Sequence, residues 1–412
     1  MLDIKFIREN LKLIEKNNQT RNVKLDLKKL VELDDERKQL QAEIESLRSE
    51  RKKMSKTKPL ESEIIEMRKL GDKIKELEER FKEAENGSNE LLYKIPNINH
   101  KSTPVGPDES CNVVETKVGK PPQFSFKPKE HFEVKAVQNL MDLERGAKAS
   151  GSRFFYLRGK LAQLERAIMQ LAIDTMVEKG FELVLPPIMV KEVAMFGAGF
   201  FPAEKNEIYR VNPGEDDLYL IGTSEVPLIY MHSDEVLEEK DLPKKYVGFS
   251  PCFRREAGSY GKDTKGLIRV HQFYKVEMVV LCKPEDSWKI HDQLLSFEQE
   301  VLKKMELPFQ VVNLCSGDLG FPAAKKYDCE GWFPGQDRYR ELTSTSNTTD
   351  YQSRRSNIKY KTADGKREFV HTLNGTVSSD RPLLAIIENN QQADGSIIIP
   401  EALRKYTGFD KI

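Results

Sequence analysis

The chain has 412 residues, which predicts two or three domains because a single hydrophobic core rarely grows beyond about 250 residues. Its 66 basic and 66 acidic residues cancel to a formal net charge of zero. This balance excludes a globally basic nucleic-acid coat but leaves room for a local basic patch. Charged residues make up 32% of the chain, which favours at least one long, highly solvated element.

The sequence offers little support for a membrane segment or a disulfide framework. Its longest apolar runs fall far short of the roughly 20 residues that cross a bilayer. The N-terminal stretch MLDIKFIREN is charged and has no apolar core, unlike a secretory signal. The five cysteines are odd in number and form no CxxC pair, which argues against disulfides and zinc ribbons. We therefore expect a cytoplasmic protein with no membrane anchor and no zinc site.

Residues 1–100 are expected to form a helical N-terminal domain. Asp3 is a suitable N-cap for a first helix over IKFIRENLKLIEKN, which the polar residues 17–22 then end. Apolar residues recur at seven-residue spacing between Asp26 and Met54. In a second run, from Met67 to Ala84, they alternate three and four apart. Both patterns are typical of coiled-coil helices.

A short break, Lys-Thr-Lys-Pro at 56–59, separates the two heptad stretches. Pro59 disfavours helix in the residue before it, so the break predicts an antiparallel helical hairpin over about residues 26–86. At a rise of 1.5 Å per residue, each helix would be roughly 40 Å long. Asn86-Gly87-Ser88 is expected to interrupt the second helix.

Basic residues gather near the tip of this hairpin, opposed only by Glu50. Basic side chains at the end of a lever suit contacts with nucleic-acid phosphates, which give affinity and orientation. The same cluster is equally compatible with a merely solvated helix end. The candidate RNA-binding residues are Arg48, Arg51, Lys52, Lys53, Lys56 and Lys58.

Residues 101–130, rich in proline, glycine and lysine, are expected to link this domain to a globular body over residues 131–412. In the body, LERAIMQLAIDTMVEKG is an amphipathic helix that Gly180 ends. Several β-branched runs are strand-like and lack crossover-length helices between them, which predicts an α+β fold with an antiparallel sheet. There is no glycine-rich phosphate-binding loop. The strand-like runs are FELVLPPIMV, LYLIGT, KYVGFS, GLIRVHQF, YKVEMVVL and PFQVVNLC.

The body resembles the catalytic domain of class II aminoacyl-tRNA synthetases, and the whole chain resembles the seryl-tRNA synthetase family. The resemblance rests on GSRFFYLRGKLAQLERA, TSEVPL, FRREAGSYGKDTKGLIRVHQFYKVE and ENNQQADGSIIIPEALRKY. It implies a class II antiparallel β-sheet flanked by helices, preceded by an antiparallel coiled-coil arm that reaches for the long variable arm of the tRNA.

This resemblance implies that L-serine and ATP form seryl-adenylate, and that the seryl group then passes to tRNA(Ser). The family also leaves open the charging of tRNA(Sec). One rival is a ligase that loads amino acids onto a carrier protein, but such proteins lack the long arm. Another is a non-catalytic paralogue that acts as an RNA-binding or scaffold protein. The retained Arg254, Glu256, Phe273 and Glu277 argue against that rival.

Joining a carboxylate to the α-phosphate of ATP requires fixed positive charge, and arginines are the natural source. By resemblance, Arg254 would bridge the serine carboxylate and the α-phosphate, and Glu256 would accept from the adenine amino group. Arg269 would hold the β- and γ-phosphates, while Phe273 would stack on the purine. Arg381 would cover the other adenine face and touch the γ-phosphate. Arg254 and Arg381 are thus the expected catalytic residues.

The Mg²⁺ ion that accompanies ATP prefers oxygen ligands, which by resemblance come from Glu341 and Ser344. Without the resemblance, the surrounding YRELTSTSNTTDYQSRR reads as a polar loop. His271, in the run RVHQF, is expected to have a structural role.

Serine would be distinguished from alanine by hydrogen bonds to its hydroxyl group. A site built to bind that hydroxyl rejects an amino acid without it, because polar groups of the site then lack a partner. Glu277 lies in an apolar run, where a buried carboxylate that needs a partner is credible even without homology. The serine-binding residues that the resemblance implies are Thr223, Glu225, Arg254, Glu277 and Thr376.

Residues 179–186 resemble the motif that forms the dimer interface of class II synthetases, so we expect a homodimer. The loop AGSYGKDTKG after Glu256 would respond to ATP and then to the tRNA. Three departures from the family pattern stand out: Arg255 where the family more often has a small residue, Leu342-Thr343 in place of the commoner Ile-Ser, and a third motif that is one residue short. From Asn374 to Arg381 there are seven steps where the family usually has eight, and the adjacent Asp380 could pair with Arg381.

Overall fold

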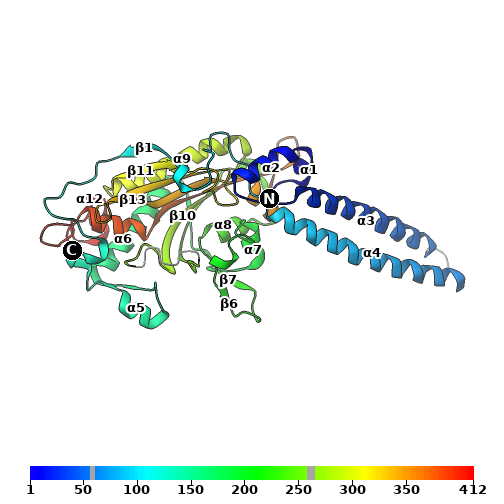
Figure 1. The fold of residues 1–412 in the computed structure, drawn as a ribbon, viewed down its shortest axis with the longest axis horizontal. Helices are drawn as coiled ribbons and strands as arrows, with labels where there is room; N and C mark the ends of the chain where they lie inside the picture. Colours follow the sequence, from blue (N-terminus) through cyan, green and yellow to red (C-terminus); the bar gives the residue numbers. More distant parts are fainter. Residues whose placement is uncertain (56–60, 258–264) are drawn as a thin grey trace. The chain divides into compact units, whose positions relative to one another are not determined.

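The computed structural model describes residues 1–55, 61–257 and 265–412. Two compact units make up the chain: Leu2–Pro96, and Asn97–Ile412 together with Met1. Figure 1 gives the order of the elements along the chain. The predicted break at 56–59 lies outside the described residues, as do Lys56, Lys58 and positions 258–264 of the loop after Glu256.

The N-terminal unit is helical, as predicted. The Asp3 carboxylate accepts from the backbone N–H groups of Lys5 and Phe6, and so caps the first helix. The prediction of one helix over this segment was wrong, because the chain breaks at Asn10 and resumes as far as Thr20. The helices of this unit are α1 (Ile4–Glu9), α2 (Leu11–Thr20), α3 (Leu27–Met54) and α4 (Glu61–Tyr93).

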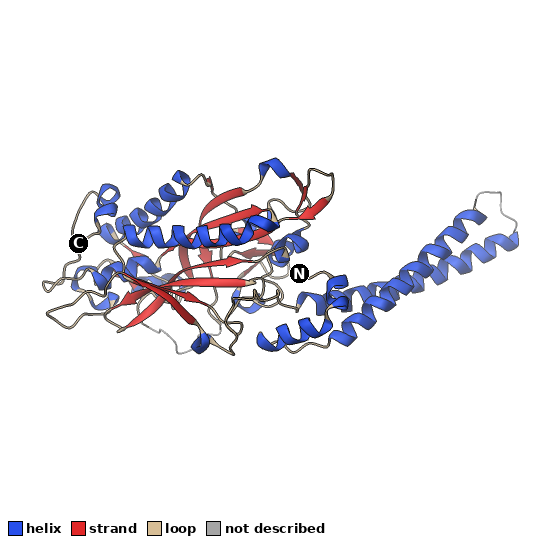
Figure 2. Cartoon of the chain, turned by 90° about the horizontal axis from the view of Figure 1, so that it is seen from above, coloured by secondary structure: helices blue, strands red, loops and turns tan. Residues whose placement is uncertain are grey.

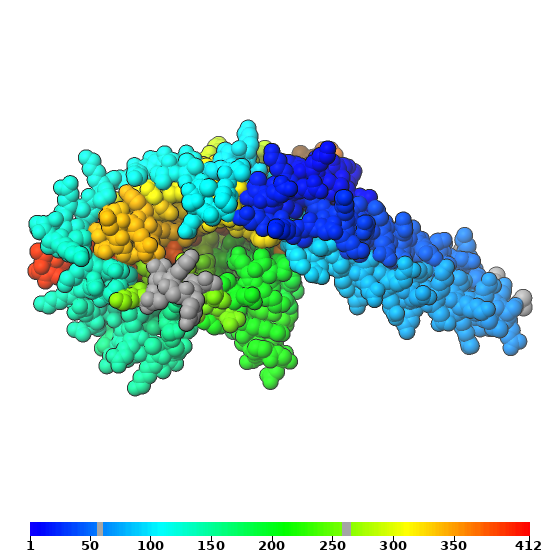
Figure 3. Space-filling view, viewed as in Figure 1, coloured from blue at the N-terminus to red at the C-terminus, as the bar shows by residue number. Residues whose placement is uncertain are grey.

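Helices α3 and α4 form the predicted hairpin. Leu40 and Ile44 of α3 pack with Ile74, Leu77 and Ala84 of α4 in one apolar cluster. Figures 1 and 3 show the two helices side by side along their length. Heptad spacing therefore identified the contact face correctly.

Helix α4 is longer than predicted, since it passes through Asn86-Gly87-Ser88 and ends at Tyr93. Ala84, Ser88 and Leu92 are buried at four-residue spacing, so this part of the helix keeps an inner face. The packing of that face outweighs the roughly 1 kcal/mol that one glycine costs within a helix.

An eight-stranded sheet forms the centre of the second unit, in the order β1-β11-β12-β13-β16-β10-β9-β4. All neighbouring strands are antiparallel except β4 and β9, which are parallel. This arrangement confirms the predicted α+β class. The strands are β1 (Val113–Val118), β4 (Glu182–Val184), β9 (Lys244–Phe253), β10 (Gln272–Cys282), β11 (Phe309–Asn313), β12 (Lys325–Phe333), β13 (Arg338–Asn347) and β16 (His371–Ser379).

Strand β10 shows how the sheet divides core from site. Val276, Met278 and Val280 face the main apolar core, which also includes residues of α6 (Gly159–Glu178), α9 (Ser287–Lys304) and α11 (Arg381–Asn389). Successive side chains of a strand alternate between faces, so Lys275 and Glu277 lie on the opposite side. Figure 2 shows helices lying along the sheet.

Shorter elements complete this unit. Two three-stranded sheets have the orders β5-β7-β6 and β15-β14-β8, and β2 pairs with β3. The remaining helices are α5 (Leu143–Ser150), α7 (Glu192–Gly197), α8 (Glu225–Tyr230), α10 (Tyr351–Ser356) and α12 (Glu401–Thr407). The short strands are β2 (Met141–Asp142), β3 (Tyr156–Leu157), β5 (Met189–Lys191), β6 (Arg210–Val211), β7 (Leu218–Leu220), β8 (Val236–Glu238), β14 (Lys359–Lys361) and β15 (Arg367–Phe369).

Three segments differ from their predicted structure. Residues 101–130, expected as a linker, supply the edge strand β1, which pairs with β11. The run GLIRVHQF is mostly not a strand: β10 begins only at Gln272. The polar run YRELTSTSNTTDYQSRR, which its composition alone suggested was a loop, forms most of β13 and α10. In the parts of the chain that the structure describes, no helix combines the length and apolar character needed to span a membrane.

Candidate active site

Two adjoining cavities bring the predicted serine and ATP residues together. The larger has a volume of about 520 Å³ and the smaller about 90 Å³. Arg254, Glu256, Lys275 and Ser344 line both. The other predicted residues of the larger cavity are Thr223, Glu225, Arg269 and Glu277, and those of the smaller one are Phe273, Glu341, Thr376 and Arg381.

Glu225 is a buried acid at the start of α8, in the wall of the larger cavity. Its Oε1 accepts from Gln352 Nε2 at 2.6 Å and from Asn374 Nδ2 at 2.9 Å. Thr223 Oγ1 accepts from the backbone N–H of Glu225 at 3.2 Å, which fixes the entry to the helix. Burial and the nearby charge of Glu277 raise the pKa of Glu225 to about 7.

Glu277, on β10, is 2% exposed, and one of its carboxylate oxygens has two partners. Its Oε2 lies 2.9 Å from Lys275 Nζ and accepts from Thr376 Oγ1 at 2.9 Å. The expectation of a buried carboxylate with partners at this position is therefore confirmed. The ammonium of Lys275 balances a charge that would otherwise be costly to bury.

Two β-bulges aim polar side chains at the cavities. On β16, Thr376 faces Glu277 and Ser378 faces Val276, so Val377 is an extra residue. On β13, Glu341 pairs with Glu330 and Thr343 with Cys329, so Leu342 is extra. Regular alternation would place residues three apart on opposite faces. The bulge instead lets Glu341 and Ser344 line the same cavity.

Arg254 follows the last residue of β9 and is held by its backbone. Its N–H donates to His271 O at 3.0 Å, and its guanidinium lies 5.4 Å from the centre of the Phe273 ring. Glu256 adopts a φ of 51°, which ends the extended conformation. Arg269 Nη1 and Glu256 Oε2 are 3.1 Å apart, so the two expected ATP contacts already pair.

Arg381, the first residue of α11, points at Glu341. Its Nη1 donates to both Glu341 Oε2 and Glu341 O at 2.9 Å. Burial alone would raise the pKa of Glu341, but the charges of Arg381 and Lys326 outweigh it and hold that pKa at about 2. The sequence also allowed an ion pair between Arg381 and Asp380. In the structure Arg381 pairs with Glu341, and Asp380 Oδ1 accepts from the backbone N–H of Tyr274 at 2.8 Å.

The oxygen atoms of Glu341 and Ser344 suit Mg²⁺, because an ionised carboxylate and a hydroxyl are ligands of the hard type that this ion prefers. Among the residues that the structure describes, no group of three or more His, Cys, Asp or Glu side chains could hold a metal ion. If Mg²⁺ accompanies ATP, the side chains of Glu341 and Ser344 would hold it and the ion would neutralise phosphate charge.

Sequence reasoning missed several residues of the site. Lys275 could have been found, because it precedes Glu277 by two positions and so shares its face of β10. Gln352 on α10 gave no signal, since only the folded chain brings it to Glu225. Arg255, noted as unusual, is exposed. His271 Nδ1 contacts Tyr209 Oη at 2.7 Å and Arg254 O at 3.0 Å, consistent with a structural role.

The described basic residues of the hairpin tip are exposed on the last turns of α3. Arg48 Nη2 lies 2.8 Å from Glu78 Oε1 on α4, so part of its charge is compensated within the hairpin. Arg51, Lys52 and Lys53 form the last basic turn of the helix.

Comparisons with known proteins place the whole chain in one family. A family model for the seryl-tRNA synthetase N-terminal domain matches residues 1–99, and one for the tRNA synthetase class II core domain (G, H, P, S and T) matches residues 208–390. The serine–tRNA ligase of Thermodesulfovibrio yellowstonii is 44% identical, with 100% of both chains covered. The chain belongs to the seryl-tRNA synthetase family. The ligase of Dictyoglomus turgidum is 43% identical over 100% of this chain and 99% of its own.

Solved structures of the seryl-tRNA synthetase family share the fold over the full length. The enzyme of Pyrococcus horikoshii, complexed with ATP, has a TM-score of 0.90 at 42% identity and covers 100% of this chain and 99% of its own. The cytoplasmic enzyme of Naegleria fowleri, in complex with AMP, has a TM-score of 0.86 at 34% identity, with 100% and 98% covered.

Proposed function

We propose that this chain attaches L-serine to tRNA(Ser) through a seryl-adenylate intermediate. The observation that carries the proposal is the meeting of Arg254, Arg381 and the buried acids Glu225 and Glu277 in two adjoining cavities. The relatives are named for serine alone. They give no support for charging tRNA(Sec) or for the non-catalytic alternative.

In the first step, a carboxylate oxygen of serine attacks the α-phosphorus of ATP, and the bond from that phosphorus to the bridging oxygen breaks to release pyrophosphate. Arg254 lines both cavities and can therefore hold the serine carboxylate and the α-phosphate together. Neutralising two like-charged reactants in a partly dry site is the main electrostatic task. Arg269 and Arg381 are assigned to the remaining phosphates.

Glu256 and Phe273 are assigned to the adenine ring, through the amino group and the ring face. Mg²⁺ bound with ATP would neutralise phosphate charge, with Glu341 and Ser344 as its protein ligands. In the second step, a hydroxyl of the terminal tRNA nucleotide attacks the acyl carbon and AMP leaves. No general base of the enzyme is required, because the adenylate is already activated.

Serine is assigned to the larger cavity, which Thr223, Glu225 and Glu277 line, and Thr376 lies in the wall of the adjoining smaller cavity. Glu277 and Thr376 already hydrogen-bond each other, and a serine hydroxyl can join that pair. Alanine in the same place would bring no hydroxyl to this pair, and a site built to bind a substrate hydroxyl favours serine over such an analogue by about 10⁴–10⁵ in kcat/KM.

Pyrophosphate exchange measured separately with each proteinogenic amino acid tests this function. We expect exchange with serine far above that with alanine, threonine or cysteine. Preference for another amino acid would overturn the serine assignment. Exchange with none of them would support the non-catalytic alternative.

Serine binding should depend on the ionisation of Glu225, because its carboxylate would accept from the ammonium group of serine. With its pKa raised to about 7, the acid loses its charge as the pH falls below that value. The KM for serine should therefore be lowest above pH 7 and rise about tenfold between pH 8 and pH 6. Initial rates at saturating ATP measure this. A flat profile, or the same profile in Glu225→Gln, would contradict the assignment.

We assign residues 1–100 as the tRNA-binding domain and residues 131–412 as the catalytic domain, with residues 101–130 connecting the two and adding strand β1 to the sheet of the catalytic domain. The hairpin carries the candidate RNA contacts, and exposed Arg51, Lys52 and Lys53 suit phosphates of the tRNA. A family model for the N-terminal domain covers nearly the same residues. The named Naegleria fowleri relative is cytoplasmic, which supports the same location here.

We also propose a homodimer. A groove of about 820 Å³ runs beside α6 and β4, where apolar side chains are exposed to solvent. Leu185 is 74% exposed and Leu183 44%, and Tyr156 and Tyr274 also line the groove. Contiguous apolar surface of this kind marks an interaction site. Sedimentation equilibrium that gives the mass of one subunit would refute the dimer.

A further inference from the structure

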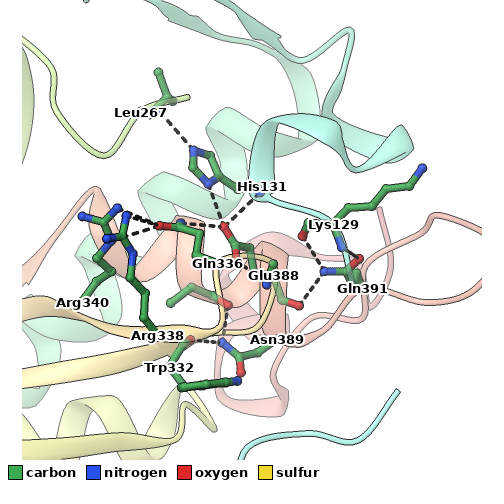
Figure 4. Close-up of polar contacts among 12 residues, drawn as sticks. Lys129, His131, Leu267, Trp332, Gln336, Arg338, Arg340, Glu388, Asn389 and Gln391 are labelled. Carbon is green, nitrogen blue, oxygen red and sulfur yellow. Dashed lines mark hydrogen bonds and ion pairs between the residues drawn. The ribbon is translucent and has the colours of Figure 1, made fainter. Parts of the chain in front are cut away.

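A buried hydrogen-bond network surrounds Glu388 on α11, apart from the cavities described above (Figure 4). Glu388 Oε1 accepts from the backbone N–H of His131 at 3.0 Å and from Gln336 Nε2 at 3.2 Å, and lies 2.9 Å from His131 Nδ1. Its Oε2 accepts from Gly335 N at 3.0 Å. Both Glu388 and His131 have fully buried side chains. Four donors thus satisfy one buried carboxylate.

The hydrogen bond at the second ring nitrogen of His131 determines which tautomer the imidazole adopts. The backbone N–H of Leu267 donates to His131 Nε2 at 3.1 Å, so Nε2 must be the unprotonated nitrogen. Nδ1 therefore carries the proton and donates it to Glu388. The imidazole joins two segments of the chain: Leu267, which comes just before β10, and Glu388 in the last turn of α11.

The backbone before Leu267 lies directly against the imidazole. Gly266 has a φ of 68°, and a Cβ atom there would be 2.1 Å from His131 Nε2. Only glycine fits both the conformation and the close approach. The backbone of Gly266 therefore packs directly against the imidazole of His131, three residues before Arg269.

The network ends close to three of the assigned ATP contacts. Leu267 is two residues before Arg269, and Glu388 is two helical turns after Arg381. Gln336 Oε1 accepts from Arg340 Nε at 3.0 Å and from Arg340 Nη2 at 2.8 Å, and Arg340 is the neighbour of Glu341. Three segments that would meet the triphosphate and its Mg²⁺ are thus tied to one buried pair (Figure 4).

We propose that His131 is a positioning residue for ATP: with Glu388 it fixes the segment of Arg269 relative to α11 and β13, and so sets the spacing of the groups that bind the triphosphate. The proposal rests on the proposed function in that it takes ATP as the ligand. His131 lines neither cavity and acts only through Leu267 and Glu388.

The variant His131→Asn separates the two bonds of the imidazole. An asparagine amide nitrogen can take the place of Nδ1 and still donate to Glu388, but nothing then reaches the N–H of Leu267. We expect the Kd for ATP with Mg²⁺, measured by calorimetry, to rise about tenfold, because the segment that carries Arg269 is no longer held by the imidazole. The Kd for serine should stay close to that of the wild type, while the thermal unfolding midpoint should fall modestly, because the buried N–H of Leu267 loses its partner.

His232→Asn is a matched control. His232 also uses both ring nitrogens, with Glu235 Oε2 at 2.7 Å and Tyr246 Oη at 2.9 Å, but it lines neither cavity. It should leave the Kd for ATP unchanged. Gly266→Ala provides a second test that keeps His131 and Glu388. It should weaken ATP binding as well, and the double variant should be no weaker than the more affected single one.

An unchanged Kd for ATP in both His131→Asn and Gly266→Ala would overturn the proposal. Equal losses for ATP and serine together with a lowered unfolding midpoint would also overturn it, because His131 would then merely stabilise the fold. Calorimetry keeps this test separate from the proposed function: wild-type protein that binds ATP but exchanges no pyrophosphate with serine contradicts the function and not the role of His131.

Discussion

Replacing residues 30–85 with a short connection should abolish charging of tRNA while serine-dependent pyrophosphate exchange continues. Every residue assigned to serine and ATP lies in the compact unit Asn97–Ile412, whereas the deleted hairpin belongs to Leu2–Pro96. The hairpin core is a cluster of its own, so its removal takes away no wall of either cavity. Aminoacylation and exchange assays on the same preparation measure the two activities.

A milder variant tests whether tRNA charging needs the basic residues of the hairpin tip or only the length of the hairpin. Reversing the charges of Arg51, Lys52 and Lys53 to Glu keeps the hairpin but should weaken tRNA binding and reduce its salt dependence. Reversing Lys29, at the other end of α3, is the matched control and should have little effect. Loss of exchange together with charging in the deletion would refute this division of labour between the two units.

Arg381→Ala should lower the rate of serine-dependent exchange, or raise the KM for ATP, by about tenfold to a hundredfold. The lost contacts are charge-assisted hydrogen bonds, each worth about 1.5–3 kcal/mol. The variant also leaves the ionised Glu341 without the guanidinium that holds its pKa low. Exchange rates over a range of ATP concentrations distinguish a change in KM from a change in kcat.

A conservative variant and a control variant help to interpret the result for Arg381→Ala. Arg381→Lys should recover only part of the loss, because an ammonium keeps the charge but not the planar fork that binds two oxygens. Arg404→Ala, on α12, removes an arginine that donates to Ile399 O and lines neither cavity, and it should behave as wild type. Wild-type kinetics in Arg381→Ala would show that the shortened motif has lost its contact with ATP.

Local patterns predicted the helices of the N-terminal unit well, because a coiled-coil face depends on side chains a few residues apart. The cap at Asp3 is as expected, since its carboxylate bonds to backbone N–H groups only two or three residues on. Asn86-Gly87-Ser88 misled the prediction because propensity is weak beside packing. The break at Asn10 left no comparable signal.

The sheet was harder to predict where its strands are polar. Strand β13 contains TSTSN, a composition that favours turns, yet Thr343 donates to Glu298 Oε2 at 2.8 Å and Thr345 to Asn374 O at 2.9 Å. Those partners come from α9 and β16, so the strand is stable only within the folded sheet. Likewise, Leu267 and Val270 looked like strand residues because they are apolar, but they fill the core from an irregular segment.

The residue types of the site followed from the resemblance, but their spatial relations did not. Gln352 and Asn374 reach Glu225 from a helix and a strand that lie far from it in sequence. Arg381 pairs with Glu341 rather than with its neighbour Asp380, because the first turn of α11 directs the two side chains differently. Such contacts depend on tertiary structure alone.

The extra residue at Val377 changes how a spacing along β16 should be counted. A strand that contains an unpaired residue can gain or lose one amino acid there while the ladder on both sides keeps its partners. The number of residues between Asn374 and Arg381 can therefore vary by one without changing the distance between these two residues in the fold. A shorter or longer version of this interval can deliver the arginine to the same place.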